Sequence, residues 1–171
     1  MDDLDALRHL LAESTDPDNP PAEEIRRLFE TMKRIAVVGL SRDPANSARR
    51  VPAYLAAKGY EVVGVNPSLE RAFGKPAVAS LDEVEPPVDM VIIFRPSAEA
   101  GSFVKQALGR PDAPAIWLQQ GIRADAEVAQ AREEGRLAVQ DLCAFKVHRA
   151  LYTDGGRKAR RRERDAAPPT P

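Results

Sequence analysis

The spacing of apolar residues predicts two helices at the start of the chain. Leucines at positions 4, 7, 10 and 11 share one helical face, and the run Asp16 to Pro21 then breaks that helix. Between Ile25 and Met32 the apolar residues again follow the i, i+3, i+4, i+7 spacing. We therefore expect an N-terminal helical extension ahead of the rest of the fold.

The middle of the chain alternates short apolar runs with helical patterns. Runs without polar alternation are typical of parallel strands that are buried on both faces. The expected strands are 35–39, 61–65, 89–94, 115–118 and 137–139, with a further short strand near 77–79. The expected helices between them are 48–58, which Gly59 ends, 97–108, which Ser97 caps, and 125–134.

This alternation predicts an α/β fold, a Rossmann-like parallel sheet of five to six strands flanked by helices. The expected strand order is 3-2-1-4-5. Ligands of such open sheets bind in the crevice at the carboxyl ends of the strands, where the topology reverses.

We divide the chain into N-terminal helices packed on the domain (1–32), the Rossmann-like domain (33–152) and a basic, Pro-rich tail (153–171). The tail lacks apolar residues to bury, which predicts disorder. It is read either as a solvated tail or as a basic arm that touches RNA or another acidic partner. The tail shows no aromatic interleaving that would favour a specific nucleic-acid site.

Composition narrows the class of protein. The 171 residues are 43% hydrophobic, which suits one domain with one core, and the formal net charge of −1 gives no general attraction to nucleic acid or membranes. A single cysteine excludes an intrachain disulfide and favours a reducing compartment. The acidic start and the lack of an apolar run of about 18–20 residues predict a soluble cytoplasmic protein without a membrane partner.

The loop after the first strand carries the strongest candidate site. Gly39 permits a tight turn and a close approach of a ligand, and the loop leads into a helix N-terminus, which favours phosphate. The loop and the following helical turn supply polar and cationic groups at Ser41, Arg42, Asn46, Ser47, Arg49 and Arg50. The loop lacks G-x-G-x-x-G, and its alternative interpretation is an ordinary capped βα loop.

Asn66 and Pro67 follow the second strand, where NAD-binding folds carry an acidic residue for the ribose. Pro67 offers a flat apolar wall to an adenine ring, or the pair simply forms a turn.

After the third long strand come Phe94, Arg95 and Pro96. A guanidinium is not left unpaired at a buried strand end, so Arg95 either pairs with a carboxylate of the fold or faces a ligand anion.

The fourth strand end supplies amide groups. Gln119 and Gln120 offer donors and acceptors at the mouth of the crevice, and Gly121 allows the turn. Trp117 is interpreted either as core or as part of this site.

Taken together, these segments resemble the CoA-binding-domain family of small proteins, typified by the bacterial YccU-type proteins. The same fold forms the N-terminal domain of the succinyl-CoA synthetase α subunit. The resemblance spans 32–151 and rests on an ordered set of segments: 35–41, 47–60, 65–67, 88–91, 94–95, 117–121 and 141–143.

The resemblance implies that coenzyme A, or an acyl-CoA, is the ligand. It implies phosphate contacts from Gly39, Ser41, Ser47 and Arg50, an adenosine part bordered by the Asn66-Pro67 corner, and a further border at Phe94 and Arg95. Relatives often carry Lys just after the Asn-Pro corner, where this chain has Ser68-Leu69, so Arg71 or Lys75 is the candidate to compensate. Relatives also often carry an acid after the cysteine, which this chain lacks.

The functional hypotheses are therefore three. The leading one is a non-catalytic CoA-binding or regulatory module. The alternatives are an NAD(P)-dependent Rossmann enzyme and a basic-tailed interaction protein with a vestigial pocket. The sequence contains no convincing set of nucleophile, base and acid and no metal-ligand spacing, and His9 and His148 are read as structural or solvated.

Cys143 has two interpretations. It is either a small buried hydrophobe or a thiol near the pantetheine sulfur that forms a mixed disulfide with CoA. Homodimerisation is left open by the sequence.

Overall fold

The structure, a computed structural model, describes residues 4–152. Its main feature is a five-stranded sheet in the order β2-β1-β5-β6-β7, in which every pairing is parallel. The strands are β1 (Arg34–Val38), β2 (Glu61–Val65), β5 (Met90–Ile93), β6 (Ala115–Leu118) and β7 (Ala138–Val139). The predicted α/β, Rossmann-like class is confirmed, while the tail (153–171) and residues 1–3 lie outside the described residues.

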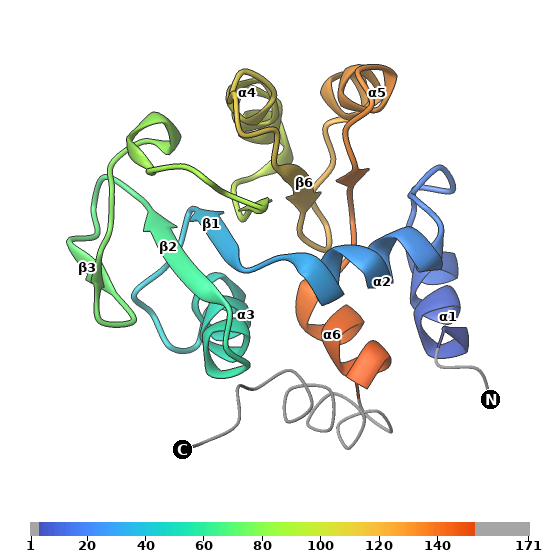
Figure 1. The fold of residues 1–171 in the computed structure, drawn as a ribbon, viewed down its shortest axis with the longest axis horizontal. Helices are drawn as coiled ribbons and strands as arrows, with labels where there is room; N and C mark the ends of the chain where they lie inside the picture. The colour runs from blue at the N-terminus through green and yellow to red at the C-terminus, as the bar shows by residue number, and fades with distance from the viewer. Residues whose placement is uncertain (1–3, 153–171) are drawn as a thin grey trace, which may run out of the picture.

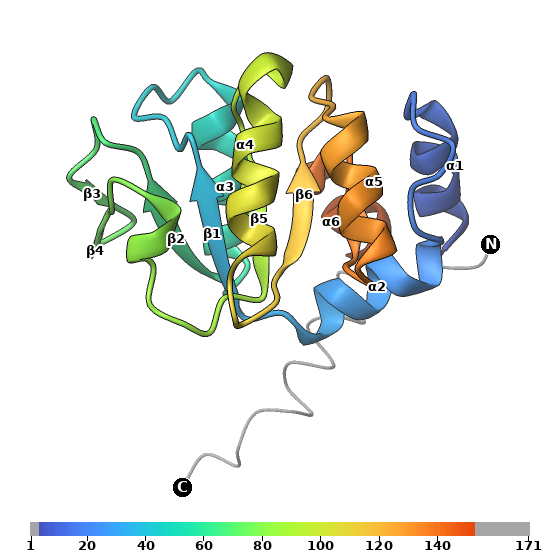
Figure 2. The same ribbon diagram turned by 90° about the horizontal axis from the view of Figure 1, so that it is seen from above.

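Helices cover both faces of this sheet (Figures 1 and 2). On one face lie α3 (Ser47–Ala57) and α6 (Ala144–Tyr152), and on the other lie α4 (Ser97–Leu108) and α5 (Asp125–Glu133). Successive β1 side chains point to opposite faces of the sheet. Ile35 and Val37 pack in one apolar cluster, and Ala36 and Val38 pack in the other. The sheet is therefore buried on both faces, as its unbroken apolar runs predicted.

The predicted short strand at 77–79 is reduced to a single bridge. Val78 forms an isolated parallel bridge with Val65 at the outer side of β2. The order of the five sheet strands along the chain is 2-1-3-4-5, which differs from the expected 3-2-1-4-5, because the third long strand, β5, pairs with β1 and not with β2. If the Val65–Val78 bridge is counted as a strand beside β2, the order becomes 3-2-1-4-5-6. The segment before it forms a small antiparallel hairpin of β3 (Arg71–Ala72) and β4 (Lys75–Pro76), followed by the 3-10 helix η1 (Leu81–Glu83).

The N-terminal extension packs beside the β7 end of the sheet (Figure 2). It consists of α1 (Asp5–Glu13), which packs against α6, and α2 (Ala22–Thr31), which leads into β1. Leu7, Ile25 and Phe29 are buried in the same cluster as the α6 side of the sheet, and the Phe29 ring meets Trp117 edge to face at 5.6 Å. These contacts explain the apolar spacing of the two helices.

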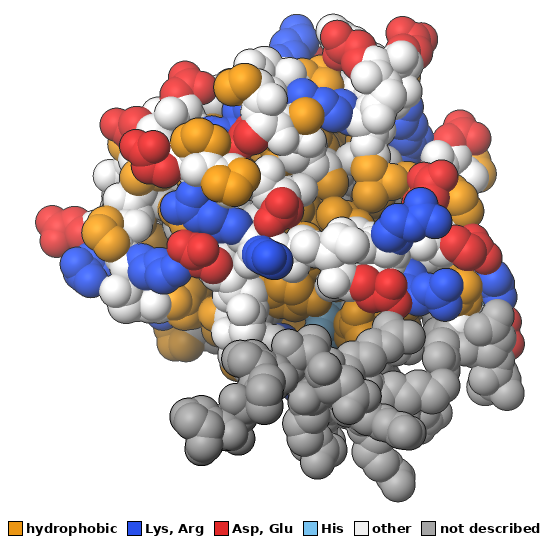
Figure 3. Space-filling view, viewed as in Figure 1, with side chains coloured by type: hydrophobic (Ala, Val, Ile, Leu, Met, Phe, Trp, Pro, Cys, Tyr) orange, Lys and Arg blue, Asp and Glu red, His pale blue; other side chains and the backbone are white. Residues whose placement is uncertain are grey.

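The exposed surface carries both signs of charge. In Figure 3, basic and acidic side chains alternate across the face in view, with hydrophobic groups between them. Within residues 4–152 no helix is both long enough and apolar enough to cross a bilayer.

Candidate functional site

The topological switch point of the sheet lies between β1 and β5, and we call the region at the carboxyl ends of these two strands the crevice. The strand β1 leads into α3 on one face of the sheet, whereas its neighbour β5 leads into α4 on the opposite face (Figure 1). The two connections therefore diverge at the carboxyl ends of these strands. In open α/β sheets this divergence creates the ligand crevice.

The sheet register aligns the predicted site residues in one row. Val38 pairs with Val65 on one side and with Ile93 on the other, and Ile93 pairs with Leu118. Each predicted segment begins one residue beyond these pairs. The row that results is Asn66, Gly39, Phe94 and Gln119.

Gly39 is the point where the first and third segments touch. Its φ is +84°, and a Cβ atom there would lie 2.9 Å from Cδ of Arg95 and 3.2 Å from the carbonyl oxygen of Phe94. Its N–H donates to the Val65 carbonyl at 2.9 Å. Only a glycine combines this backbone conformation with so close an approach, so the Arg95 side chain lies directly over the turn.

The β1–α3 loop is organised by its own polar side chains. The Ser41 hydroxyl accepts from the Asp43 N–H at 3.0 Å, and Asn46 caps α3 by accepting from the Ala48 N–H at 2.9 Å. Ser47 is the first residue of α3 and is exposed. The predicted phosphate-binding segment is thus an ordered loop that ends in an exposed helix N-terminus.

The cations around the crevice have different partners. Arg42 donates to the Ser68 carbonyl, and the Arg49 guanidinium stands 4.3 Å from the centre of the Phe73 ring. The Arg50 side chain is exposed. These contacts hold the β1–α3 loop against the segment that follows β2.

Arg95, in the connection between β5 and α4, pairs with an acid in the first turn of α4. Its Nε donates to Oε2 of Glu99 at 2.8 Å, and its Nη2 lies 2.6 Å from the same oxygen. Of the two interpretations of Arg95, the structure shows the paired one. The pair is exposed to solvent, with side-chain accessibilities of 43% and 50%.

The Asn66 side chain ties the second segment to the first. Its Nδ2 donates to the Leu40 carbonyl at 3.0 Å, and its Oδ1 accepts from the Ser68 N–H at 2.9 Å. Pro67 beside it is exposed. The position that holds a ribose-binding acid in NAD-binding folds is thus occupied by an amide that braces the loop.

The fourth segment contributes mainly to the fold. Gln119 is 5% exposed, and its Oε1 accepts from the Ala144 N–H at 3.2 Å, at the start of α6. Trp117 is fully buried and donates to the Leu142 carbonyl at 2.8 Å, which confirms its interpretation as core. The Gln119 amide is therefore turned into the fold, away from the mouth of the crevice where we expected it.

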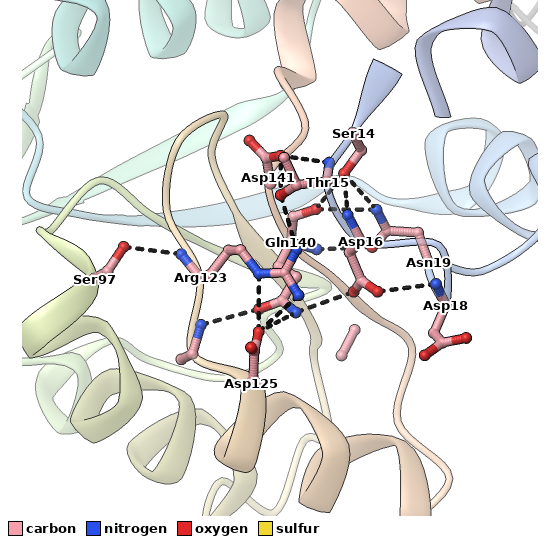
Figure 4. Close-up of polar contacts among 12 residues, drawn as sticks. Ser14, Thr15, Asp16, Asp18, Asn19, Ser97, Arg123, Asp125, Gln140 and Asp141 are labelled. Carbon is pink, nitrogen blue, oxygen red and sulfur yellow. Dashed lines mark hydrogen bonds and ion pairs between the residues drawn. The ribbon is translucent and has the colours of Figure 1, made fainter. Parts of the chain in front are cut away.

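Gly121 is held by the carboxylate of Asp141. The Gly121 N–H donates to Oδ1 of Asp141 at 2.7 Å, and the N–H and hydroxyl of Thr15 donate to Oδ2 at 2.8 and 2.7 Å. Burial works to raise the pKa of Asp141, but the hydrogen bonds from Thr15 and Gly121 outweigh it and lower the pKa. One carboxylate thereby connects the N-terminal segment to the loop after β6 (Figure 4).

A second polar cluster continues along the β7 edge (Figure 4). The nearly buried Asp16 accepts from Arg132 Nη2 and from Gln140 Nε2, each at 3.0 Å. Burial tends to raise the pKa of Asp16, and its hydrogen bonds and the Arg132 charge reverse this and lower it. Arg123 joins the two clusters, because it donates to the Thr15 hydroxyl at 2.8 Å and to Oδ1 of Asp125 at 2.9 Å, and this Asp125 oxygen also accepts from Gln140 Nε2.

Cys143 lies on the boundary between the core and a small pocket. It is a buried free thiol packed within the apolar cluster, and it also lines a pocket with Leu10, Gln120 and Lys146. Part of the lining follows β6 and β7, and the rest comes from the end of α1 and from α6, so this pocket is on the same edge of the sheet as the crevice but on the far side from β1.

The two histidines lie apart from the crevice residues. His9 is exposed on α1, and one ring nitrogen is 2.8 Å from the Asp5 carbonyl. His148 is buried on α6, with its Nδ1 2.8 Å from the Tyr54 hydroxyl. Among residues 4–152 there is no cluster of three or more His, Cys, Asp or Glu side chains that is suited to a metal ion.

Sequence reasoning missed two groups that organise this edge. Glu99 is the partner of Arg95, and its i, i+4 spacing at a helix start was a readable signal. Asp141 was noted only as part of the resemblance, and its contact with Thr15 spans 126 positions, which local patterns do not reveal. Ser97 was expected to cap α4, but Pro96 holds that position and the Ser97 hydroxyl accepts from the Arg123 N–H instead.

Comparison with known proteins identifies a family whose model matches most of the chain. Residues 33–149 match the model of the CoA binding domain family. The chain is 38% identical over 130 residues to the uncharacterized protein YneT of Bacillus subtilis (strain 168), which covers 76% of this chain and 96% of YneT.

Solved structures agree with this match. A Thermus thermophilus protein described as cell-free ID.343 is 36% identical with a TM-score of 0.71, covering 75% of this chain and 97% of its own. A hypothetical protein from Pyrococcus horikoshii OT3 is 28% identical with a TM-score of 0.73, covering 81% of this chain and 97% of its own.

Proposed function

This chain belongs to the CoA-binding domain family, and on that basis we propose that it binds coenzyme A or an acyl-CoA at the carboxyl ends of its strands. We propose further that it acts as a non-catalytic binding or regulatory module. The binding surface would be formed by the β1–α3 loop, the Asn66-Pro67 corner and the Phe94 to Pro96 segment.

The observation that carries this proposal is the close packing of Gly39 against Arg95 at the switch point. The glycine leaves the turn without a side chain, and the arginine lies across it. The α3 N-terminus opens on the same side of the sheet, with Ser47 and Arg50 exposed in its first turn. Helix N–H groups together with guanidinium groups suit the phosphates of CoA.

The contacts of Asn66 favour CoA over a nicotinamide dinucleotide. Both polar atoms of its side chain are engaged with the backbone of Leu40 and Ser68. A carboxylate that would bind ribose hydroxyls is absent from that position. CoA instead carries a 3′-phosphate that NAD lacks, and the arginines near this corner are suited to it.

Isothermal titration calorimetry tests the proposal. The full-length protein, stripped of nucleotide, is titrated with CoA, and NAD and NADP serve as controls. We expect heat of binding with CoA and weaker or no binding with the dinucleotides. Absence of CoA binding, or tighter binding of NAD(P), would refute the proposal.

Cys143 requires a separate experiment, because its thiol lines a pocket on the same edge. In the proposed reaction its thiolate attacks one sulfur of oxidised CoA, forms a mixed disulfide and releases one CoA thiol. Intact mass under non-reducing conditions should show one CoA adduct on the parent and none on Cys143→Ser. An unmodified parent would leave Cys143 as a packing residue.

A further inference from the structure

The ion pair between Arg95 and Glu99 sits at the mouth of the proposed site. Arg95 is the second residue after the end of β5, and Glu99 lies in the first turn of α4. Both guanidinium contacts go to the single oxygen Oε2, at 2.8 and 2.6 Å. Of the four crevice arginines, 42, 49, 50 and 95, Arg95 is the one for which the described structure shows a carboxylate partner.

The two parts of the Arg95 side chain differ: its aliphatic part packs against Gly39, whereas its guanidinium can rotate. Its Cδ would lie 2.9 Å from a Cβ at Gly39, so the aliphatic part of the side chain packs against the backbone of the turn. The Arg95 side chain as a whole is 43% accessible to solvent. A rotation of the guanidinium alone would therefore change its partner.

The Arg95–Glu99 ion pair is weak enough for a ligand to replace Glu99 as the partner of Arg95. An exposed i, i+4 ion pair contributes little to stability because water screens it and both side chains lose freedom. A phosphate offers the same guanidinium a bidentate, charge-assisted contact, which is stronger. A phosphate group in the crevice would thus displace Glu99 from Arg95.

We infer that Glu99 is a built-in competitor for the ligand phosphate, which holds Arg95 in the free protein and lowers the affinity of the site. The inference rests on the proposed CoA site. Binding must break the Arg95–Glu99 pair before the Arg95 guanidinium can contact the phosphate. Glu99 is therefore a positioning residue that acts through Arg95.

A double-mutant cycle on the full-length protein tests this inference. Glu99→Gln keeps the shape of the side chain and removes its charge, and we expect it to tighten CoA binding by about two- to fivefold, as loss of an exposed ion pair implies. Arg95→Ala should weaken binding. In the Arg95→Ala background, Glu99→Gln should have a clearly smaller effect, because its effect is transmitted by Arg95.

Glu133→Gln is the matched control. It makes the same change in charge at the last residue of α5, at the opposite edge of the sheet, and it is also exposed. We expect parent-like affinity for it. Thermal unfolding of each variant shows whether an effect arises from lost stability.

The outcomes are distinct. A parent that fails to bind CoA refutes the proposed function itself. If the parent binds CoA and Glu99→Gln has the same affinity as the parent, the competitor role alone is overturned. The same holds if Glu133→Gln gains as much affinity as Glu99→Gln. An undiminished effect of Glu99→Gln without Arg95 overturns it too, because Glu99 would then act directly on the ligand.

Discussion

The side-chain amide of Asn19 pairs with both backbone groups of Gln140, just beyond the edge strand β7. The Asn19 Nδ2 donates to the Gln140 carbonyl and the Gln140 N–H donates to the Asn19 Oδ1, each at 3.0 Å. The amide thereby takes the hydrogen bonds that another strand would make. Arg132 donates to the Ala138 carbonyl on the same strand, so the N-terminal segment and α5 together cover this edge.

Removing the Asn19 amide should therefore destabilise the fold. Asn19→Ala leaves a backbone donor and an acceptor of the buried Gln140 without this partner, and we expect the free energy of unfolding to fall by about 1–3 kcal/mol. Urea unfolding measures the change. Asp18→Ala, in the same segment but exposed, should remain within about 0.5 kcal/mol of the parent. Equal losses for the two variants would contradict the edge-covering role.

Regular elements were predictable because their signals are local. Apolar spacing and end signals located 48–58, 97–108 and 125–134, and the structure gives Ser47–Ala57, Ser97–Leu108 and Asp125–Glu133. Strand order decides where the connections diverge, and the expected order placed the switch point beside the first strand, where the structure also has it. The segment at 77–79 became one bridge, and Pro76 beside it has no N–H to extend a ladder.

The side-chain partners were predictable only in part. The Arg95–Glu99 spacing is visible in the sequence, but whether Arg95 pairs with an acid or stays open depends on the packing around Gly39. The Thr15–Asp141 and Asn19–Gln140 contacts join segments more than 100 positions apart. Such pairs depend on how the N-terminal extension folds back, and the spacing of its leucines carries no information about that.

Arg50 is the exposed cation whose loss should reduce affinity most cleanly. Arg50→Ala removes a charge in the first turn of α3, and we expect CoA affinity to fall by about 10- to 100-fold if one charge-assisted phosphate contact is lost. Stability should change by no more than about 0.5 kcal/mol. Calorimetry and urea unfolding give the two values.

The control for Arg50→Ala is Arg27→Ala. Arg27 is an exposed arginine on α2, so the change in net charge is the same. Equal CoA affinity in parent and Arg50→Ala would remove Arg50 from the site. An equal loss in both variants would show that overall charge, not a contact, governs binding.

His148 should make stability depend on pH. Burial lowers its pKa to about 4, with a smaller contribution from the Lys58 charge, and its neighbours include the Tyr54 hydroxyl and the rings of Phe29 and Tyr60. The folded protein therefore favours neutral His148. Its stabilising effect is complete above the unfolded pKa of about 6.5 and is lost as the pH falls from there toward 4.

Between pH 7 and pH 5 we expect the free energy of unfolding to fall by about 2 kcal/mol from this group alone. The range lies above the unfolded pKa values of Asp and Glu, so the carboxylates contribute little. His148→Phe keeps an aromatic ring and should flatten the dependence, measured by urea unfolding at both pH values. The same slope in both proteins would show that another group is responsible.

A comparison of alanine variants at Gly39 and Gly59 separates the effect of backbone strain from the effect on CoA binding. Gly39 and Gly59 both have positive φ, +84° and +101°, so alanine at either should cost about 1–2 kcal/mol of stability. A Cβ at Gly59 meets nothing within 4 Å, whereas a Cβ at Gly39 would lie 2.9 Å from Arg95 Cδ and 3.2 Å from the Phe94 carbonyl oxygen. Gly39→Ala therefore displaces Arg95 and should cost more stability than Gly59→Ala. We expect Gly39→Ala to lower CoA affinity by about tenfold or more, since a misplaced guanidinium loses its charge-assisted contact, and Gly59→Ala to leave it unchanged. Calorimetry at a temperature where both variants are folded makes the comparison, and equal affinities would mean that the packing of Arg95 over Gly39 serves the fold rather than the ligand.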